Sequence, residues 1–161
     1  MAGLDHMPLA VADLQKATAT YRSLGFSIKP GRLHSNGIEN NNIKFRDGSG
    51  IELITASHGV DALTTTYRHL LETAEGPAFF ALHVRDTGKL IKALQQNAIA
   101  YSGTGDLIEL NAPALNFLFL VADNRSPTDR PEHFEHRNGA SAMIRVWIAL
   151  SDDHELRRLR Y

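Results

Sequence analysis

The sequence has 161 residues, 43% of them hydrophobic and 22% charged, which is typical of a globular protein with its own core. Seventeen Lys and Arg residues against eighteen Asp and Glu residues give a formal charge of −1, so neither a nucleic acid nor a membrane surface is an expected partner. The absence of cysteine excludes disulfides, thiolate metal ligands and a cysteine nucleophile. Since no signal-like or membrane-spanning segment is found, the sequence favours a soluble, cytoplasmic protein.

The first part of the chain predicts a strand, a helix and three further strands. LDHMPLAVADL (4–14) alternates apolar and polar residues as a strand does, Asp13 is placed to cap the following helix, and Gly25 is placed to end it. Three short strands are then expected, in the stretches FSIKP, NNIKFRD and IELIT.

A helix over about 60–74 is expected to link this unit to a second copy of the same pattern. One face of this helix is apolar, with Leu63, Tyr67, Leu70 and Leu71. PAFFALHVRD (77–86) then repeats the opening strand, and Asp86 takes the place of Asp13. The sequence therefore predicts one domain, 1–161, made of two units over about 1–57 and 77–122.

The last third predicts a strand and a helix over about 142–161. MIRVWIAL and SDDHELRRLRY repeat features of LAVADLQKATATY: the strand, the acidic cap, and a tyrosine eight residues after an aspartate. Two interpretations stay open. Either this segment closes the domain, or it begins a third unit and the chain is the N-terminal part of a longer parent protein.

Three blocks carry a family resemblance: LDHMPLAVADL, RLHSNGIENNNIKFRDGSGIELI and HRNGASAMIRVWIAL. Together they resemble the glyoxalase-like domain family of the vicinal oxygen chelate superfamily, which includes glyoxalase I, extradiol dioxygenases and fosfomycin or bleomycin resistance proteins. In the middle block, Ile38 replaces the family's usual threonine, and Asn40 holds the asparagine place. The resemblance implies an α+β fold in which paired βαβββ units form a cup-shaped, half-open barrel with helices outside.

Strand alternation predicts which side chains such a cup would present. Those expected to pack under the helices are Met7, Leu9, Ile43, Phe45, Ile51 and Leu53. Those expected to line the cup are His6, Asn42, Lys44 and Glu52. A carboxylate at position 52, within an apolar strand, must meet a partner or water, so Glu52 is the predicted catalytic residue.

The resemblance also implies a divalent metal ion. His6 and Glu52 match the superfamily's ligand positions in the first unit, and imidazole with carboxylate suits Fe, Zn, Ni, Mn or Co. His83 is expected to face the same cup and is the third predicted ligand, which would give the facial triad of non-haem Fe(II) oxygenases. A four-ligand site is not expected, because Phe79 stands where His6 would recur and NFLFLVADN has no carboxylate where Glu52 would recur.

The predicted substrate contacts are His34, Asn40, Asn42, Lys44, His136 and Asn138. The last two belong to an HxNG pattern that is also typical of a simple turn. The sequence thus predicts a glyoxalase-like protein that binds a small oxygen-bearing metabolite, with metal-dependent lyase, isomerase or dioxygenase chemistry if it is an enzyme. The alternative is a metal-free, ligand-binding or sequestering protein of the resistance type. A homodimer, or completion by the missing part of a longer parent chain, is expected.

Overall fold

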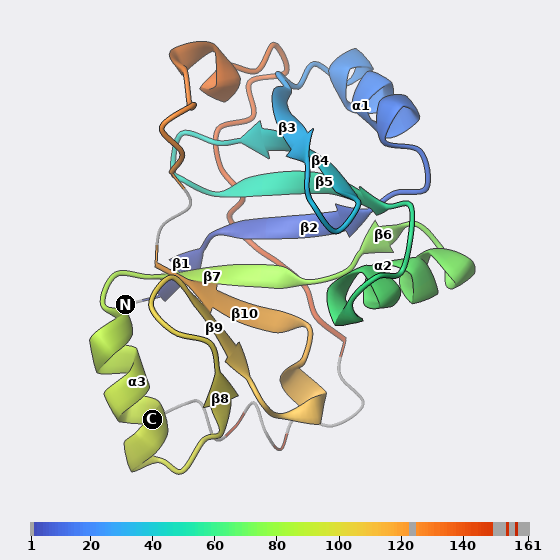
Figure 1. Ribbon diagram of the computed structural model, residues 1–161. Helices are drawn as coiled ribbons and strands as arrows, with labels where there is room; N and C mark the ends of the chain where they lie inside the picture. The colour runs from blue at the N-terminus through green and yellow to red at the C-terminus, as the bar shows by residue number, and fades with distance from the viewer. Residues whose placement is uncertain (1, 123–124, 150–153, 155–156, 158–161) are drawn as a thin grey trace. The chain divides into compact units, whose positions relative to one another are not determined.

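The computed structural model describes residues 2–122, 125–149, 154 and 157 (Figure 1). The chain divides into two compact units. The first unit consists of His6–Ala78 and Arg125–Met143, and the second of Met1–Asp5, Phe79–Asn124 and Ile144–Tyr161. The first few residues therefore belong to the second unit, although the sequence grouped them with the strand that follows.

The first unit is built on one five-stranded sheet. Its order is β3 (Lys29–Leu33), β4 (Ile38–Lys44), β5 (Gly50–Ala56), β2 (His6–Ala10), β6 (Gly76–Pro77). The central pair, β2 and β5, is parallel, and the other neighbours are antiparallel. The parallel pair is separated in the chain by a helix and two strands, as a crossover connection requires.

Two helices pack on this sheet, and each begins at an aspartate. Helix α1 (Leu14–Ser23) is capped by Asp13, whose side chain accepts a hydrogen bond from the Lys16 amide, and it contacts β4 and β5. Helix α2 (Ala62–Thr73) is capped by Asp61 and contacts β5 and β2. Gly25 follows α1 with a φ of +89°, a value that glycine adopts without strain.

The two faces of this sheet differ in chemistry. On the face toward α1 lie Ile43 and Leu53, both fully buried, and Asn41, whose side chain donates to the Thr18 hydroxyl at 2.9 Å. The register pairs Asn42 with Glu52, so both project from the opposite face. We call this side the Glu52 face; its polar residues are His6, Lys29, Asn40, Asn42, Lys44 and Glu52.

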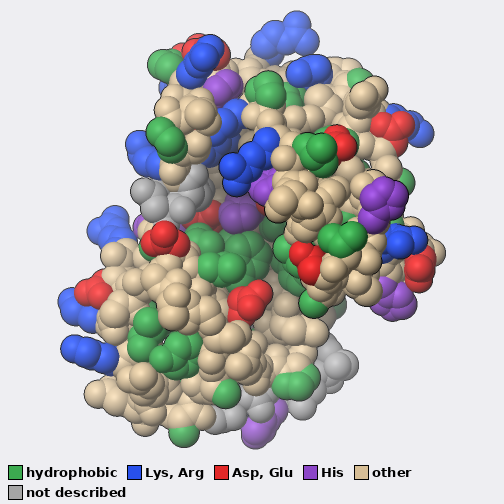
Figure 2. All heavy atoms as spheres, in the orientation of Figure 1, with side chains coloured by type: hydrophobic (Ala, Val, Ile, Leu, Met, Phe, Trp, Pro, Cys, Tyr) green, Lys and Arg blue, Asp and Glu red, His purple; other side chains and the backbone are tan. Residues whose placement is uncertain are grey.

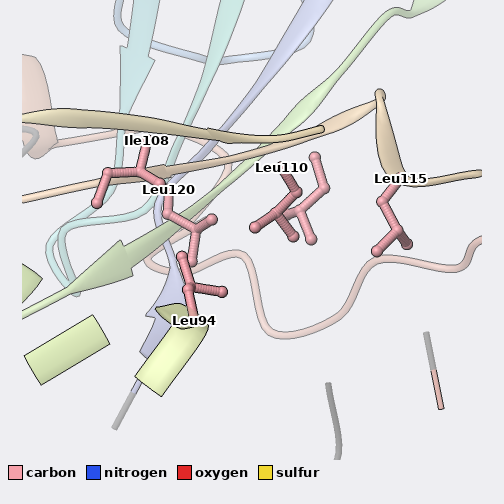
Figure 3. Close-up of a cluster of buried hydrophobic side chains, with 6 residues drawn as sticks. Leu94, Ile108, Leu110, Leu115 and Leu120 are labelled. Carbon is pink, nitrogen blue, oxygen red and sulfur yellow. The ribbon is translucent and has the colours of Figure 1, made fainter. Parts of the chain in front are cut away.

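The second unit repeats the pattern. Its sheet has the order β1 (Ala2–Leu4), β7 (Phe80–Val84), β10 (Leu118–Val121), β9 (Leu107–Leu110), β8 (Tyr101–Ser102). Helix α3 (Thr87–Gln96) is capped by Asp86, as predicted. Figure 3 shows the core of this unit, in which Leu94 of α3 lies against buried leucines and Ile108 of the sheet. The predicted α+β class with paired βαβββ units is therefore confirmed.

Three sequence predictions differ from the structure. The strand expected in FSIKP (26–30) begins only at Lys29 and runs to Leu33. The opening strand is not continuous: it breaks at Asp5, so that β1 pairs with β7 and β2 pairs with β5. Residues 142–149 form no strand, although their pattern predicted one. The Met143 amide donates to the Ser49 hydroxyl instead of a neighbouring strand, and Trp147 is 84% exposed, because alternation forms a strand only where a ladder partner exists. The predicted helix after this segment lies mostly outside the described residues.

The surface agrees with the balanced composition. On the face in Figure 2, Lys and Arg side chains are interspersed with Asp and Glu. Among the described residues, each helix is too short or too polar to cross a lipid bilayer.

Candidate functional site

Glu52 and its immediate neighbours form the centre of the candidate site. Only 17% of the Glu52 side chain is exposed. Its Oε1 accepts a hydrogen bond from Asn40 Nδ2 at 2.5 Å, and its Oε2 lies 3.6 Å from His6 Nε2. These side chains come from three adjacent strands, β4, β5 and β2, whose register places all of them on the Glu52 face. The structure thus brings together three of the predicted site residues.

The hairpin between β3 and β4 fixes the orientation of Asn40. The Oδ1 of Asn40 accepts a hydrogen bond from the Arg32 amide at 3.0 Å, so its NH₂ group is the one that reaches Glu52. The backbones approach closely at this point, because a Cβ on Gly31 would lie 2.0 Å from the Asn40 carbonyl oxygen. The local bulge of β3 and the absence of a side chain at position 31 therefore position the group that holds Glu52.

Tyr67 is a site residue that sequence reasoning treated only as part of an apolar helix face. Its side chain, on α2, is almost completely buried. Burial raises the pKa of the Tyr67 hydroxyl well above its ordinary value, and the negative charge of Glu52 raises that pKa further. The hydroxyl is therefore protonated at neutral pH. The signal that could have found it is the hydroxyl itself, since Tyr67 is the one residue of the apolar face that carries a polar group.

Lys29, Lys44 and Asp129 form a buried ionic cluster on the Glu52 face. Lys29 Nζ lies 2.5 Å from Asp129 Oδ1, and Lys44 Nζ lies 2.5 Å from Asp129 Oδ2. Burial raises the pKa of Asp129, but the hydrogen bonds from both lysines outweigh this effect and hold its pKa at about 2. Sequence reasoning selected Lys44 but missed Lys29 and Asp129, because contacts 85 and 100 residues apart leave no local signal.

His34 and Asn42 lie on the same sheet as Glu52, and their role as substrate contacts stays a prediction. The His34 amide donates to the Ile38 carbonyl at 2.7 Å, so His34 extends the β3–β4 ladder beyond its last assigned pair. The Nε2 atom of His34 is buried and has no hydrogen-bond partner among the described residues. Asn42 lies directly opposite Glu52 in the register and is half-buried.

His136 and Asn138 are engaged in contacts of their own. His136 Nδ1 accepts from the Ser27 amide at 3.0 Å, and its Nε2 lies 3.1 Å from the Lys44 carbonyl oxygen. Asn138 Nδ2 donates to the Leu24 carbonyl, at the end of α1, at 2.9 Å. Within the described residues, neither side chain bonds to Glu52, and these contacts explain the HxNG pattern without a ligand. Their role in substrate binding stays a prediction.

His83 belongs to the second unit. It lies on β7, and its Nδ1 is 3.9 Å from Asp5 Oδ2. Across the described parts of the chain, no group of three or more His, Cys, Asp or Glu side chains is arranged to hold a metal ion. A divalent ion is usually held by at least three protein ligands, so His6 and Glu52 do not by themselves make a metal centre. The predicted metal site stays a prediction.

A pocket of about 240 Å³ lies elsewhere on the first unit, beside α1 and β6. Lys16, Tyr21 and Glu75 are among its lining residues, and burial raises the pKa of the Tyr21 hydroxyl. None of the residues predicted to act on substrate or metal lines this pocket.

Comparisons with known proteins give the family. A profile described as "Glyoxalase-like domain" matches residues 4–159. A search of curated proteins found no match. Among solved structures, methylmalonyl-CoA epimerase from Mycobacterium tuberculosis aligns over 76% of this chain and 89% of its own, at 19% identity and a TM-score of 0.63. The Streptomyces coelicolor epimerase, in complex with 2-nitronate-propionyl-CoA, aligns over 76% and 97%, at 17% identity and a TM-score of 0.60.

A hypothetical protein from Staphylococcus aureus aligns over 78% of this chain at 14% identity, with a TM-score of 0.61, and the chain spans 60% of that protein's length. At these identities the structural likeness shows the fold alone, whereas the profile covers nearly the whole chain. The chain therefore belongs to the glyoxalase-like domain family.

Proposed function

We propose that this chain binds a small oxygen-bearing metabolite on the Glu52 face and that Glu52 exchanges a proton with it. The observation that carries this proposal is the setting of the Glu52 carboxylate. It is largely buried, one oxygen is held by Asn40 Nδ2, and the other lies 3.6 Å from His6 Nε2. A carboxylate that is oriented and partly desolvated in this way suits a general base better than a surface carboxylate does.

The neighbouring groups supply the other parts of such a reaction. Removing a proton from a carbon next to a carbonyl leaves negative charge on the carbonyl oxygen, which donors on the same face can stabilise. His6 and Asn42 share this face with Glu52, and the protonated Tyr67 hydroxyl lies within electrostatic range of it. Lys44 and His34 are the proposed contacts for the remainder of the metabolite.

The solved relatives support isomerase chemistry by analogy. Two of them are named as epimerases of methylmalonyl-CoA. An epimerase inverts one stereocentre, and proton removal followed by return is a direct way to do so. Because the likeness is at the level of the fold, it favours this reaction class without naming the substrate.

A metal-dependent form of this chemistry is the second candidate. The 3.6 Å between His6 Nε2 and Glu52 Oε2 is short enough for one ion to contact both atoms. Further ligands would then be required, from a second copy of the chain or from the remainder of a longer parent chain. The third candidate function is that of a metal-free binding protein, in which Glu52 and His6 serve only as hydrogen-bonding groups for the ligand.

Deuterium exchange tests the proposal. We expect the protein to catalyse the exchange of deuterium from D₂O into the C–H position next to the carbonyl of methylmalonyl-CoA or of small β-dicarbonyl acids. Proton NMR measures this exchange as the loss of the C–H signal. Glu52→Gln should lower the exchange rate at least 100-fold, because the amide cannot accept the proton. Glu39→Gln is the matched control, since Glu39 is an exposed glutamate on the neighbouring strand and the opposite face.

Two arms separate the alternatives. Exchange that appears only after addition of Fe(II), Zn, Ni, Mn or Co, and is lost in His6→Ala, would favour the metal-dependent form. If no exchange occurs under any condition while the same compounds still raise the melting temperature, proton transfer is wrong and the binding protein is favoured.

A further inference from the structure

We propose that Lys29 and Lys44 form the site for a carboxylate group of the metabolite, and that Asp129 occupies this site until the metabolite displaces it. This inference rests on the proposed function, to which it adds a substrate class: small metabolites that carry a carboxylate some distance from the reacting carbon.

The first argument is the geometry of the cluster. Each lysine ammonium lies 2.5 Å from a different oxygen of the same carboxylate. The Ser126 amide adds a third donor, to Asp129 Oδ2 at 2.9 Å. The Ser126 amide belongs to the same turn as Asp129 and would leave with it, so the receptor consists of the two lysine ammonium groups, and a metabolite carboxylate presents the same two oxygens to them.

The second argument is burial. The side chains of Lys29, Lys44 and Asp129 are only 10%, 11% and 11% exposed. Buried ionic groups are costly to desolvate, and apolar residues of similar size often stabilise a protein as well or better. Two buried lysines on a ligand-binding face are therefore better explained by recognition of an anion than by stability.

The third argument is position relative to Glu52. Lys29 pairs with Asn42 on β4, and Asn42 pairs with Glu52 on β5, so the three residues form one row across three strands. Two strand spacings separate the first from the last, about 10 Å between backbones. Because the lysine side chains extend from the sheet, a small metabolite could place its carboxylate at the ammonium groups while its reacting carbon lies beside Glu52.

The fourth argument is that Asp129 can leave without unfolding the sheet. It is carried by the segment 125–143, which contributes no strand to the sheet. The same segment is held independently by His136, through the Ser27 amide and the Lys44 carbonyl, and by Asn138, through the Leu24 carbonyl. Displacing Asp129 would therefore release the turn around Ser126 and Asp129, while Phe134, Glu135 and the later residues keep their own contacts with the first unit.

Calorimetric titration with malonate tests this inference. We expect Asp129→Asn to bind malonate at least tenfold more tightly than the wild type, because the competing carboxylate is gone. Adding Lys29→Met to Asp129→Asn should abolish that gain. Glu132→Gln is the matched control: it removes the same charge from an exposed glutamate of the same segment, and should leave malonate affinity unchanged.

An equal gain in Asp129→Asn and Glu132→Gln would show only a general charge effect and would overturn the inference, as would a folded Asp129→Asn without any gain. If Asp129→Asn does not fold, the wild type gives the answer through hydrogen exchange of the Ser126 amide. Malonate should accelerate that exchange at least threefold relative to chloride of equal ionic strength, and unchanged exchange would overturn the inference.

The two proposals can fail separately. Glu52→Gln removes the proposed base but leaves the lysine cluster in place, so the malonate gain of Asp129→Asn should persist in that background. Deuterium exchange without any malonate effect would leave the proposed function standing and overturn this inference. The malonate effect without deuterium exchange would do the reverse.

Discussion

His136 should anchor the 125–143 segment to the first unit, and His136→Ala measures its contribution. The substitution removes two hydrogen bonds, to the Ser27 amide and the Lys44 carbonyl, each worth about 1 kcal/mol. It also removes edge-to-face contacts with Phe26 and Phe45, at centroid distances of 5.5 and 5.3 Å, each worth about 0.5–1.5 kcal/mol. We expect the free energy of unfolding to fall by about 3–5 kcal/mol in total.

Urea unfolding followed by far-UV circular dichroism is the assay, because Trp147 is 84% exposed and its fluorescence would report unfolding poorly. His58→Ala, which truncates an exposed histidine of the same unit, should change stability by less than about 0.5 kcal/mol. A loss below about 1 kcal/mol for His136→Ala would refute the assignment of His136 as an anchor, since even its two hydrogen bonds would then be unaccounted for.

The same residue predicts a pH dependence. Burial lowers the pKa of His136, and the charge of Arg46 lowers it too, which together outweigh the opposing effect of its hydrogen bond to the Lys44 carbonyl. A histidine with a lowered folded pKa stabilises the protein fully above its unfolded pKa of about 6.5, and this contribution is lost as the pH falls toward the folded value. Between pH 7.5 and pH 5.5, the wild type should therefore lose more stability than His136→Ala. Equal losses in the two proteins would contradict this reasoning.

Two further substitutions test the fold. Gly31→Ala would place a Cβ 2.0 Å from the Asn40 carbonyl oxygen. It should therefore lower the free energy of unfolding by more than about 2 kcal/mol and reduce the rate of deuterium exchange into the substrate. Gly3→Ala, with open space around it, is the control and should be tolerated. Ile108→Ala should lower the free energy of unfolding in urea by about 3 kcal/mol because Ile108 is fully buried. Ile144→Ala, at an 87% exposed position, is the control and should lower it by less than about 0.5 kcal/mol. Similar losses in the two variants would contradict the assignment of the cluster in Figure 3 as the core of the second unit.

Much of the fold could be predicted because its signals are local. Asp13 and Asp86 cap α1 and α3 as expected, since a cap acts on an amide three residues away. Alternation identified most strands and placed Leu53 in the core and Glu52 on the opposite face. These signals repeat in both halves of the chain, so the paired units could be recognised without a structure.

The rest of the site could not be predicted, because it depends on contacts between distant parts of the chain. Lys29 and Lys44 meet Asp129 only because the 125–143 segment returns to the first unit. The same reason explains the wrong strand at 142–149: the pattern was present, but no strand in the described part of the chain pairs with it. Tyr67 could not be recognised for a different reason. Helical spacing places a residue on one face of a helix, but it does not show that this face lies near the charge of Glu52.

The order of the strands suggests how a metabolite would be oriented in the proposed site. The two lysines lie on β3 and β4, Glu52 on β5 and His6 on β2, so positive charge, carboxylate and imidazole follow one another across the sheet. An anionic metabolite placed with its carboxylate toward Glu52 would suffer repulsion from it, whereas the reverse orientation meets two ammonium groups. That orientation brings an uncharged, acidic C–H bond to Glu52, which is the arrangement a general base needs. Reversing the charge at position 29 with Lys29→Glu should therefore weaken binding of carboxylate metabolites far more than binding of their uncharged amides.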